Sequence, residues 1–173
     1  MISRGPLSNV RLVPWSDEDF PLLVRLNAPE MTEHLGGPET DEALRKRQER
    51  YVAAAGSDSV YPLKVVLEPE GIAIGNVGIW DRKWKGEQVF EMGWGVVPEY
   101  QGRGLASAAV KQALEFAREL RRRPAVHAFP SVDNPPSNGI CRKTGFVLLG
   151  EVDFEYPKGH WMRCNDWRFS FAE

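Results

Sequence analysis

Residues 89–106 read VFEMGWGVVPEYQGRGLA, and this stretch decides the fold. It begins as an apolar β-strand, is interrupted by Pro98, and passes through a Gly-X-Gly turn into helix-forming residues. The first N–H groups of a helix have no intrahelical partner, and the helix dipole adds positive charge there. Strand, glycine turn and helix in this order therefore predict a backbone site for an anion such as phosphate or pyrophosphate.

The helix after the turn has a strong amphipathic pattern. Seven small or apolar residues recur at helical spacing and form one face: Ala106, Ala109, Val110, Ala113, Leu114, Ala117 and Leu120. Three arginines, Arg121 to Arg123, follow at the negative end of the helix dipole, and Pro124 ends the helix. We expect them to form a solvated helix end, with a phosphate or nucleic-acid contact as the alternative.

Upstream of the stretch, the patterns predict a run of strands before the glycine turn. The expected elements are strands over 10–13, 60–67 and 72–80, helices starting near Ser16 and Thr40, a loop over 31–38, and a polar turn over 81–88. Pro21 lies late for a helix that starts at Ser16, so that boundary is expected a few residues downstream. Gly75 and Gly78 predict a bulge or the close approach of another backbone.

Downstream of the stretch, the remaining elements are a short strand, a helix and a closing strand pair. The expected ranges are a strand over 125–129, a helix from Pro135 to the cap at Gly145, and strands over 146–154 and 162–171. The order β-α-α-β-β-β-α-β-α-β-β predicts one mixed α+β domain over residues 1–173.

The composition is ordinary for a soluble globular protein. Of the 173 residues, 42% are hydrophobic and 27% charged, and the formal net charge is -2. The charge argues against a general affinity for nucleic acid, and no apolar run is long enough to span a membrane. Cys141 and Cys164 do not form a disulfide framework, and the N-terminus lacks the apolar core of a signal peptide. We expect a cytoplasmic protein with neither a nucleic-acid nor a membrane partner.

Two common nucleotide signatures do not fit the glycine turn. A P-loop requires Gly-Lys-Ser or Gly-Lys-Thr at the helix start, but Gly104 is followed by Leu105 and Ala106. A dinucleotide fingerprint lies early in a βαβ unit and has an acidic residue about 20 residues downstream. Here three antiparallel-type strands come first, and arginines lie near that distance.

Two motifs carry a resemblance to a known family. The sequence QGRGLA at 101–106 is similar to the Gln/Arg-X-X-Gly-X-Gly/Ala signature of the GCN5-related N-acetyltransferases, the GNAT superfamily. The sequence NPPSNGICRKTGF at 134–146 resembles a segment of the RimJ/RimL-like subgroup, which acetylates the N-termini of ribosomal proteins. The resemblance covers nearly the whole chain. It implies the GNAT fold, a mixed, mostly antiparallel sheet of six to seven strands flanked by about four helices.

The resemblance also implies that acetyl-CoA donates an acetyl group to a primary amine. In the family, the strand before the turn carries a bulge and splays from the next strand, so that its main chain pairs with the pantetheine arm. The implied cofactor-binding residues are Val96, Val97, Gln101, Gly102, Arg103, Gly104, Leu105, Ala106, Asn134, Ser137 and Lys143. Arg142 is an alternative to Lys143 for the ribose 3′-phosphate, and Asn134 fits equally a helix cap.

The reaction needs a base for the protonated amine and an acid for the departing thiolate. The family resemblance makes Glu91 the candidate base, since relatives place a carboxylate on this strand that works through water. Partial burial would raise its pKa toward a useful range. Many relatives use a tyrosine as acid where this chain has Cys141. The resemblance to the RimJ/RimL-like subgroup instead implies that Ser137 is the acid, holding the sulfur by a hydroxyl hydrogen bond, with a helix-opening role as the alternative. Cys141 itself fits a small core residue.

The acceptor is predicted only as a class. Family members build the acceptor site from the first two helices and the last strand pair, which here carry Glu30, Glu33, His34, Asp153, Glu155, Tyr156, His160 and Trp161. Carboxylates beside aromatic rings suit a cationic amine, either a small molecule such as an aminoglycoside or a protein N-terminus. No metal site is expected, because the three histidines lie far apart in the sequence. The protein is expected to be a monomer or homodimer, and a catalytically silent CoA sensor or scaffold is the alternative function.

Overall fold

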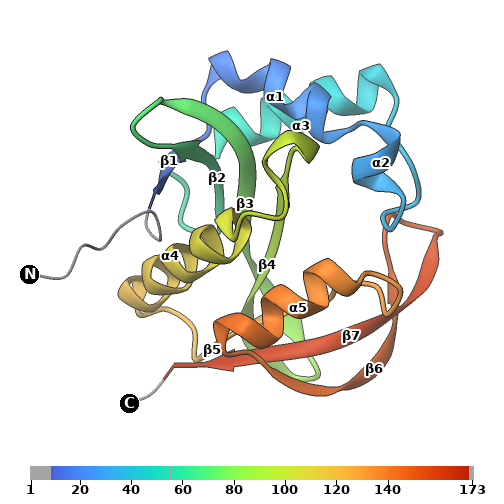
Figure 1. Cartoon of the computed structure of the whole chain (residues 1–173). Helices are drawn as coiled ribbons and strands as arrows, with labels where there is room; N and C mark the ends of the chain where they lie inside the picture. Colours follow the sequence, from blue (N-terminus) through green and yellow to red (C-terminus); the bar gives the residue numbers. More distant parts are fainter. Residues whose placement is uncertain (1–8, 55, 172–173) are drawn as a thin grey trace, which may run out of the picture.

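The structure is a computed structural model, and it describes residues 9–54 and 56–171. One seven-stranded sheet runs through it in the order β1-β2-β3-β4-β5-β7-β6 (Figure 1). The strands are β1 (Val10–Pro14), β2 (Val60–Leu67), β3 (Ile72–Trp84), β4 (Glu87–Val96), β5 (Ala125–Ala128), β6 (Val147–Glu155) and β7 (Trp161–Ser170). The α-helices are α1 (Phe20–Leu26), α2 (Pro29–Thr32), α3 (Asp41–Ala53), α4 (Leu105–Leu120) and α5 (Pro135–Thr144). The predicted α+β class and strand count are confirmed.

The β3–β4 hairpin corrects one prediction. Residues 81–88 were expected as a polar turn, which is wrong: β3 continues to Trp84 and β4 begins at Glu87. Lys85 and Gly86 alone make the turn, with φ of 49° and 83°, the positive values that a tight two-residue hairpin requires. The polar residues are paired within the sheet, as shown by the ion pair of Arg82 with Glu91.

The N-terminal helices differ slightly from expectation. A 3-10 turn over Asp17–Asp19 follows Ser16, and α1 begins at Phe20, as the position of Pro21 indicated. The predicted loop over 31–38 is wrong in its first residues, because α2 includes positions 31 and 32. Pro29 opens this short helix, and the Thr32 hydroxyl donates to Ala28 O at 3.0 Å. The predicted cap of α3 is confirmed, since Thr40 accepts from Ala43 N.

Two hydrophobic clusters hold the helices on the sheet. The larger cluster joins α4 and α5 to the middle strands, through residues such as Phe90, Met92 and Val110. The smaller cluster, with Trp15, Leu22, Leu23, Leu44 and Val97, joins α1 and α3 to the sheet. The neighbours Val96 and Val97 belong to different clusters, as expected for residues that point to opposite faces. The sheet is therefore covered on both faces near the end of β4.

Candidate active site

The turn into α4 has the geometry of an anion site. Gly104 is the N-cap of α4 with φ of 76°, and Gly102 has φ of 75°, values that favour glycine. Ala108 makes the first intrahelical bond, to Gly104 O, so the N–H groups before it are open for a ligand. The turn is exposed at its glycines and at Arg103. The side chain of Gln101 donates to Val96 O at 2.7 Å and ties the turn to the end of β4.

Beside this turn, β4 and β5 separate. These parallel strands pair at Phe90 with Val126 and at Glu91 with His127, while β4 continues as far as Val96. Residues 92–96 therefore have an edge toward β5 that lacks a strand partner among the described residues, which is the splay that the resemblance implied. The implied bulge in β4 is wrong, because its register with β3 is unbroken.

The bulge lies one strand away, in β3. The register between β2 and β3 shifts between Val65 and Val66. At this point β3 and β4 approach closely: a Cβ added to Gly75 would lie 2.1 Å from Gly95 O. The expectation for Gly75 is confirmed, because any side chain at this position would collide with the backbone of β4 at Gly95 and Val96.

Glu91 lies where β4 and β5 separate, and it is buried with 8% of its surface exposed. Arg82 Nη1 lies 2.9 Å from Glu91 Oε1, and Trp80 Nε1 donates to the same oxygen at 3.2 Å. Burial raises the pKa of Glu91, while the charge and hydrogen bond of Arg82 act in the opposite direction. The site thus holds a carboxyl with a raised pKa beside an arginine, which is a common environment for a general base.

The beginning of α5 carries two other candidates. Asn134 is the N-cap, and its Oδ1 accepts from Ser137 N at 3.3 Å, so the cap alternative is confirmed for this residue. Ser137 Oγ donates to no group in the described part of the chain and is half-buried. Lys143 is exposed near the other end of α5, and Arg142 lies over the Trp167 ring. The structure therefore brings Asn134 and Ser137 together but not Lys143.

Asn138 was missed by the sequence patterns and holds this end of α5 in place. Its Nδ2 donates to Ser131 O and Asn134 O, while its Oδ1 accepts from Asn165 Nδ2 and Trp167 Nε1, at 2.8 to 2.9 Å. A buried amide with every hydrogen-bonding position used is a strong local clamp. In the sequence, Asn138 is one of several polar residues in the predicted helix, and no motif or spacing indicates this role.

Cys141 is fully buried, and burial raises the pKa of its thiol to about 12. Such a thiol remains protonated at neutral pH and is packed in the larger hydrophobic cluster. The predicted core role is confirmed for Cys141.

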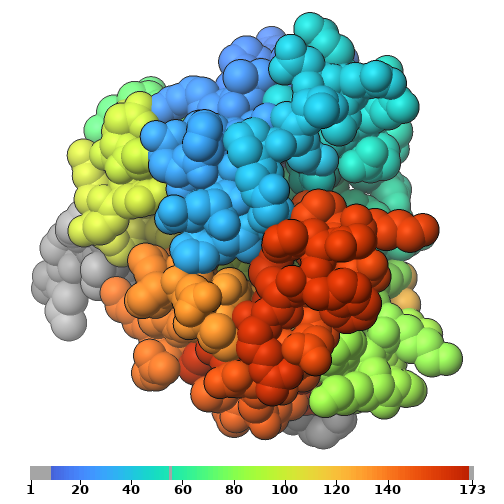
Figure 2. Space-filling view, turned by 90° about the vertical axis from the view of Figure 1, so that its right-hand side faces the viewer, coloured from blue at the N-terminus to red at the C-terminus, as the bar shows by residue number. Residues whose placement is uncertain are grey.

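The two segments expected to form the acceptor site do meet. Arg47 on α3 donates to Tyr156 OH beyond β6, and it also binds Glu39 and Tyr51. A Cβ on Gly36 would lie 3.0 Å from Pro157, so the chain after α2 touches the β6–β7 loop. Figure 2 shows this junction, where the blue and cyan N-terminal segments adjoin the red segment.

The expected acceptor residues are mostly on the surface at this junction. The exposed members are Glu30, Glu33, Asp153, Glu155, Tyr156, His160 and Trp161. Asp153 is paired with Arg163, and Glu155 accepts from Gly159 N, so neither carboxylate is free of a partner. The exposed Trp161, with 64% of its surface accessible, is the largest apolar group of this set.

A buried histidine and aspartate were also missed. His127 Nδ1 lies 2.6 Å from Asp166 Oδ1, and each side chain is only 2% exposed. Arg168 Nη1 lies 3.3 Å from His127 Nε2, and since a guanidinium only donates, Nδ1 carries the proton given to Asp166. Trp84 Nε1 donates to the other oxygen of Asp166 at 3.0 Å. Burial raises the pKa of Asp166, but these hydrogen bonds outweigh it and hold that pKa below the ordinary value.

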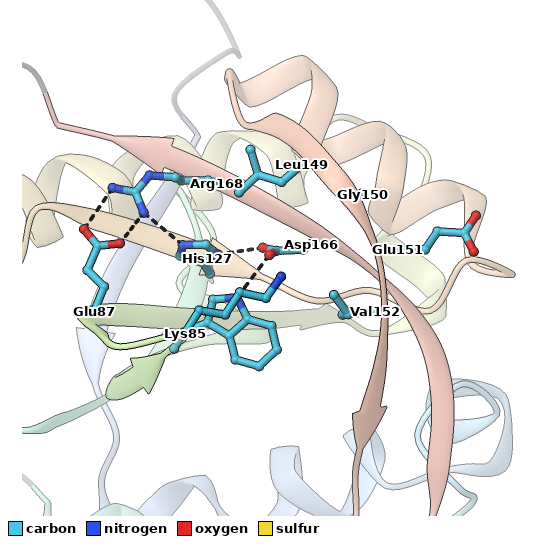
Figure 3. A pocket seen from close by; sticks show the side chains of 10 residues that line it. Lys85, Glu87, His127, Leu149, Gly150, Glu151, Val152, Asp166 and Arg168 are labelled. Carbon is cyan, nitrogen blue, oxygen red and sulfur yellow. Dashed lines mark hydrogen bonds and ion pairs between the residues drawn. The ribbon is translucent and has the colours of Figure 1, made fainter.

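This pair borders a cavity of about 260 Å³ (Figure 3). Arg168 forms a forked ion pair with Glu87 on one side of it, and Glu151 points away on the other. Trp84 connects the Glu91–Arg82 pair with the His127–Asp166 pair, because its ring lies against Arg82 and its Nε1 donates to Asp166. We call Glu91, Arg82, Trp84, Asp166 and His127 the Glu91 network.

The part of the chain that the structure describes has no group of three or more acidic, histidine or cysteine side chains arranged to hold a metal ion. None of its helices combines the length and apolar character needed to cross a membrane.

Known proteins share both the sequence pattern and the fold. A family model described as "Acetyltransferase (GNAT) domain" matches residues 9–147, so the chain belongs to the GNAT acetyltransferase family. It is 30% identical over 110 residues to YnaD of Bacillus subtilis, described as an uncharacterized N-acetyltransferase. That match covers 64% of this chain and 61% of the relative, so it spans less than two thirds of the relative's length.

Solved structures agree with the fold along nearly the whole chain. A spermidine N-acetyltransferase from Vibrio cholerae, solved with CoA and spermine, has a TM-score of 0.77 at 19% identity and covers 94% of this chain and 96% of its own. A ribosomal-protein-S5-alanine acetyltransferase from Vibrio fischeri has a TM-score of 0.76 at 18% identity, covering 94% and 93%. At these identities the likeness establishes the fold alone.

Proposed function

We propose that this chain transfers an acetyl group from acetyl-CoA to a primary amine by direct attack on the thioester. One observation carries the proposal: a buried carboxyl, Glu91, lies where β4 and β5 separate, on the strand whose far end is tied by Gln101 to the turn that opens α4. The splay offers room for an extended ligand, and the helix start offers backbone donors for a pyrophosphate. The family supplies acetyl-CoA as the matching donor.

In this proposal the cofactor lies across the turn and the splay. The N–H groups from Gly102 to Ala106, through Arg103, Gly104 and Leu105, hold the pyrophosphate, since glycines allow close backbone approach. The edge of β4 at Val96 and Val97 pairs with the pantetheine arm, and Gln101 braces that edge. Asn134 and Ser137 face the thioester end from α5, while Lys143 contacts the ribose phosphate.

The proposed chemistry uses one base and one acid. Glu91 takes a proton from the amine, directly or through water, and the freed lone pair attacks the thioester carbonyl carbon. The C–S bond then breaks, the departing thiolate takes a proton from the Ser137 hydroxyl, and the new amide nitrogen gives its surplus proton to the Ser137 oxygen, which restores the hydroxyl. The buried thiol of Cys141, whose pKa is raised to about 12, is enclosed in the core and is not assigned a role.

The proposed acceptor is an amine that carries a positive charge before reaction. Exposed carboxylates and the Trp161 ring at the junction of α2 and the β6–β7 loop support a cationic group there. Spermidine and a ribosomal protein are acted on by the named structural relatives, and the motif at 134–146 supports the RimJ/RimL-like subgroup. We treat residues 1–173 as one domain, which the continuous sheet from Val10 to Ser170 supports. The cytoplasmic location and the monomer or homodimer state stay predictions.

The test is acetyl-CoA consumption, read as free thiol, with a panel of amines: spermidine, an aminoglycoside and peptides with free N-termini. We expect turnover with at least one of them. Glu91→Gln should lower kcat about 100-fold with unchanged binding of CoA, and Ser137→Ala should lower kcat to a similar degree. Thr144→Val is the matched control, since it removes a hydroxyl from the same helix that bonds only within the helix. Binding of CoA without turnover on any amine would support the sensor or scaffold instead.

A further inference from the structure

Arg82 is held by three aromatic rings next to Glu91. Its guanidinium carbon lies 5.2 Å from the ring centre of Trp84, 5.5 Å from that of Phe129 and 4.8 Å from that of Phe154. The rings come from β3, from the residue after β5 and from β6. Cation–π attraction to several faces fixes a guanidinium that is only partly exposed. The position of Arg82 is therefore set by the fold and not by its ion pair alone.

This fixed guanidinium contacts one oxygen of the Glu91 carboxylate. Both Arg82 Nη1 and Trp80 Nε1 donate to Oε1. Oε2 accepts no hydrogen bond from the described residues, and it is not among their fully enclosed unpartnered polar atoms, so this oxygen is reachable. The carboxylate thus has one anchored oxygen and one free oxygen. A general base needs this arrangement, because its reacting oxygen must be both oriented and reachable.

We infer that Arg82 is the positioning residue of Glu91: it anchors Oε1, supplies the countercharge, and leaves Oε2 as the atom that takes the proton. The inference rests on the proposed function, in which Glu91 is the base. Arg82 itself touches neither the amine nor the cofactor in this scheme. Glu91 is its one ion-pair partner among the described residues, so the two groups act as a unit.

Charged and titratable groups face Glu91 from three strands. They are Arg82 from β3, His127 from β5, with Asp166 behind it, and Cys164 from β7. Burial raises the pKa of Glu91, and Arg82 is the strongest influence that lowers it. The thiol of Cys164 has a pKa raised to about 11 and is neutral at neutral pH. Loss of the Arg82 charge should therefore raise the pKa of Glu91 further.

The experiment measures this titration directly in the whole protein. The carboxyl carbon of Glu91 is followed by NMR in protein labelled with 13C-glutamate, and its signal is assigned by its loss in Glu91→Gln. In Arg82→Met and in Arg82→Gln we expect the midpoint to move to higher pH. The acidic limb of the kcat/KM profile should move in the same direction, with kcat/KM at neutral pH reduced about tenfold and KM for acetyl-CoA within about twofold. Arg82→Lys, which keeps the charge, should partly restore both the titration midpoint of Glu91 and the value of kcat/KM.

The matched control is Arg123→Met. Arg123 forms a comparable half-buried ion pair with Asp81, at 3.0 Å, but does not contact Glu91. Asp81 directly precedes Arg82 in β3. Arg123→Met should leave the Glu91 titration unchanged. An unchanged or lowered midpoint in both neutral Arg82 variants would overturn the inference, and Arg82→Gln keeps the test available if Arg82→Met does not fold. If Glu91→Gln retains full turnover, the proposed base is wrong, while the titration still decides the role of Arg82.

Discussion

The turn into α4 and the Glu91 network are both parts of the proposed site, but they are built in different ways. The turn consists of six consecutive residues, 101–106, and offers backbone N–H groups. The Glu91 network joins side chains from β3, β4, β5 and β7. A contiguous backbone site depends on local φ values, whereas an assembled network depends on the whole sheet. Mutations in the two regions should therefore affect different quantities.

The largest effect is expected from Asp166→Ala in the assembled region. The change leaves two donors without a partner, the buried His127 Nδ1 and the half-buried Trp84 Nε1. Breaking a buried, paired and hydrogen-bonded charge should lower the free energy of unfolding by about 3 kcal/mol. Urea denaturation measures this directly, through the midpoint at an unchanged m-value.

Asp153→Ala is the control for Asp166→Ala. Asp153 is also an ion-paired aspartate, with Arg163 as its partner, but its side chain is 74% exposed. Its removal should change the unfolding free energy by less than about 1 kcal/mol. Equal losses of unfolding free energy in the two variants would contradict the idea that the Glu91 network stabilises the fold more than a surface ion pair does.

The next effect concerns the turn, where the affinity for acetyl-CoA should change in addition to a small loss of stability. Gly104 and Gly86 have φ of 76° and 83°, and an added Cβ at either position meets nothing within 4 Å. Alanine at either glycine therefore costs about 1 kcal/mol of backbone strain. We expect Gly104→Ala also to raise KM for acetyl-CoA about tenfold, because the backbone donors move, while Gly86→Ala leaves KM unchanged. Equal KM values in the two variants would remove the turn from the cofactor site.

The contrast explains what the sequence could predict. The strand, Gly-X-Gly and helix of residues 89–106 are adjacent, so local φ preferences and helical periodicity were sufficient for the turn and for α4. The cap at Asn134 was predictable for the same reason. The splay of β4 followed from the family resemblance, whereas the bulge lies beside Gly75 in β3, where the glycine and not the resemblance predicted a bulge or a close backbone approach.

The Glu91 network was only partly predictable, because its members are far apart in the chain. Glu91 was identified, but its partner Arg82 was assigned to a turn that the structure confines to Lys85 and Gly86. Polar residues in a strand resemble a turn when their partners, such as Glu91, are not visible in the local pattern. His127 and Asp166 are 39 positions apart and belong to no spacing motif, although their contact is 2.6 Å. The positions of Arg82, His127 and Asp166 in the network are set by tertiary contacts, which the local sequence does not show.

The smallest expected effect compares the pH dependence of the two acids in the network. The pKa of Asp166 is lowered in the folded state, so its contribution to stability is present above the ordinary pKa of an aspartate and is lost as pH falls through the lower value. The pKa of Glu91 is raised, so the folded protein holds an extra proton between the ordinary value of about 4.3 and the raised value. In that window stability falls as pH rises, by at most about 1.4 kcal/mol per pH unit.

Glu91→Gln should therefore remove this slope. The difference in unfolding free energy between Glu91→Gln and the wild type should favour the variant increasingly as pH rises through the window, and should level off above it. Urea denaturation at several pH values measures the difference. A constant difference across the range would mean that Glu91 titrates equally in the folded and unfolded chains, and that Arg82 fully offsets the burial of its carboxyl. Asp166 would then be the acid in the Glu91 network that still makes stability depend on pH, which continues to distinguish this region from the turn.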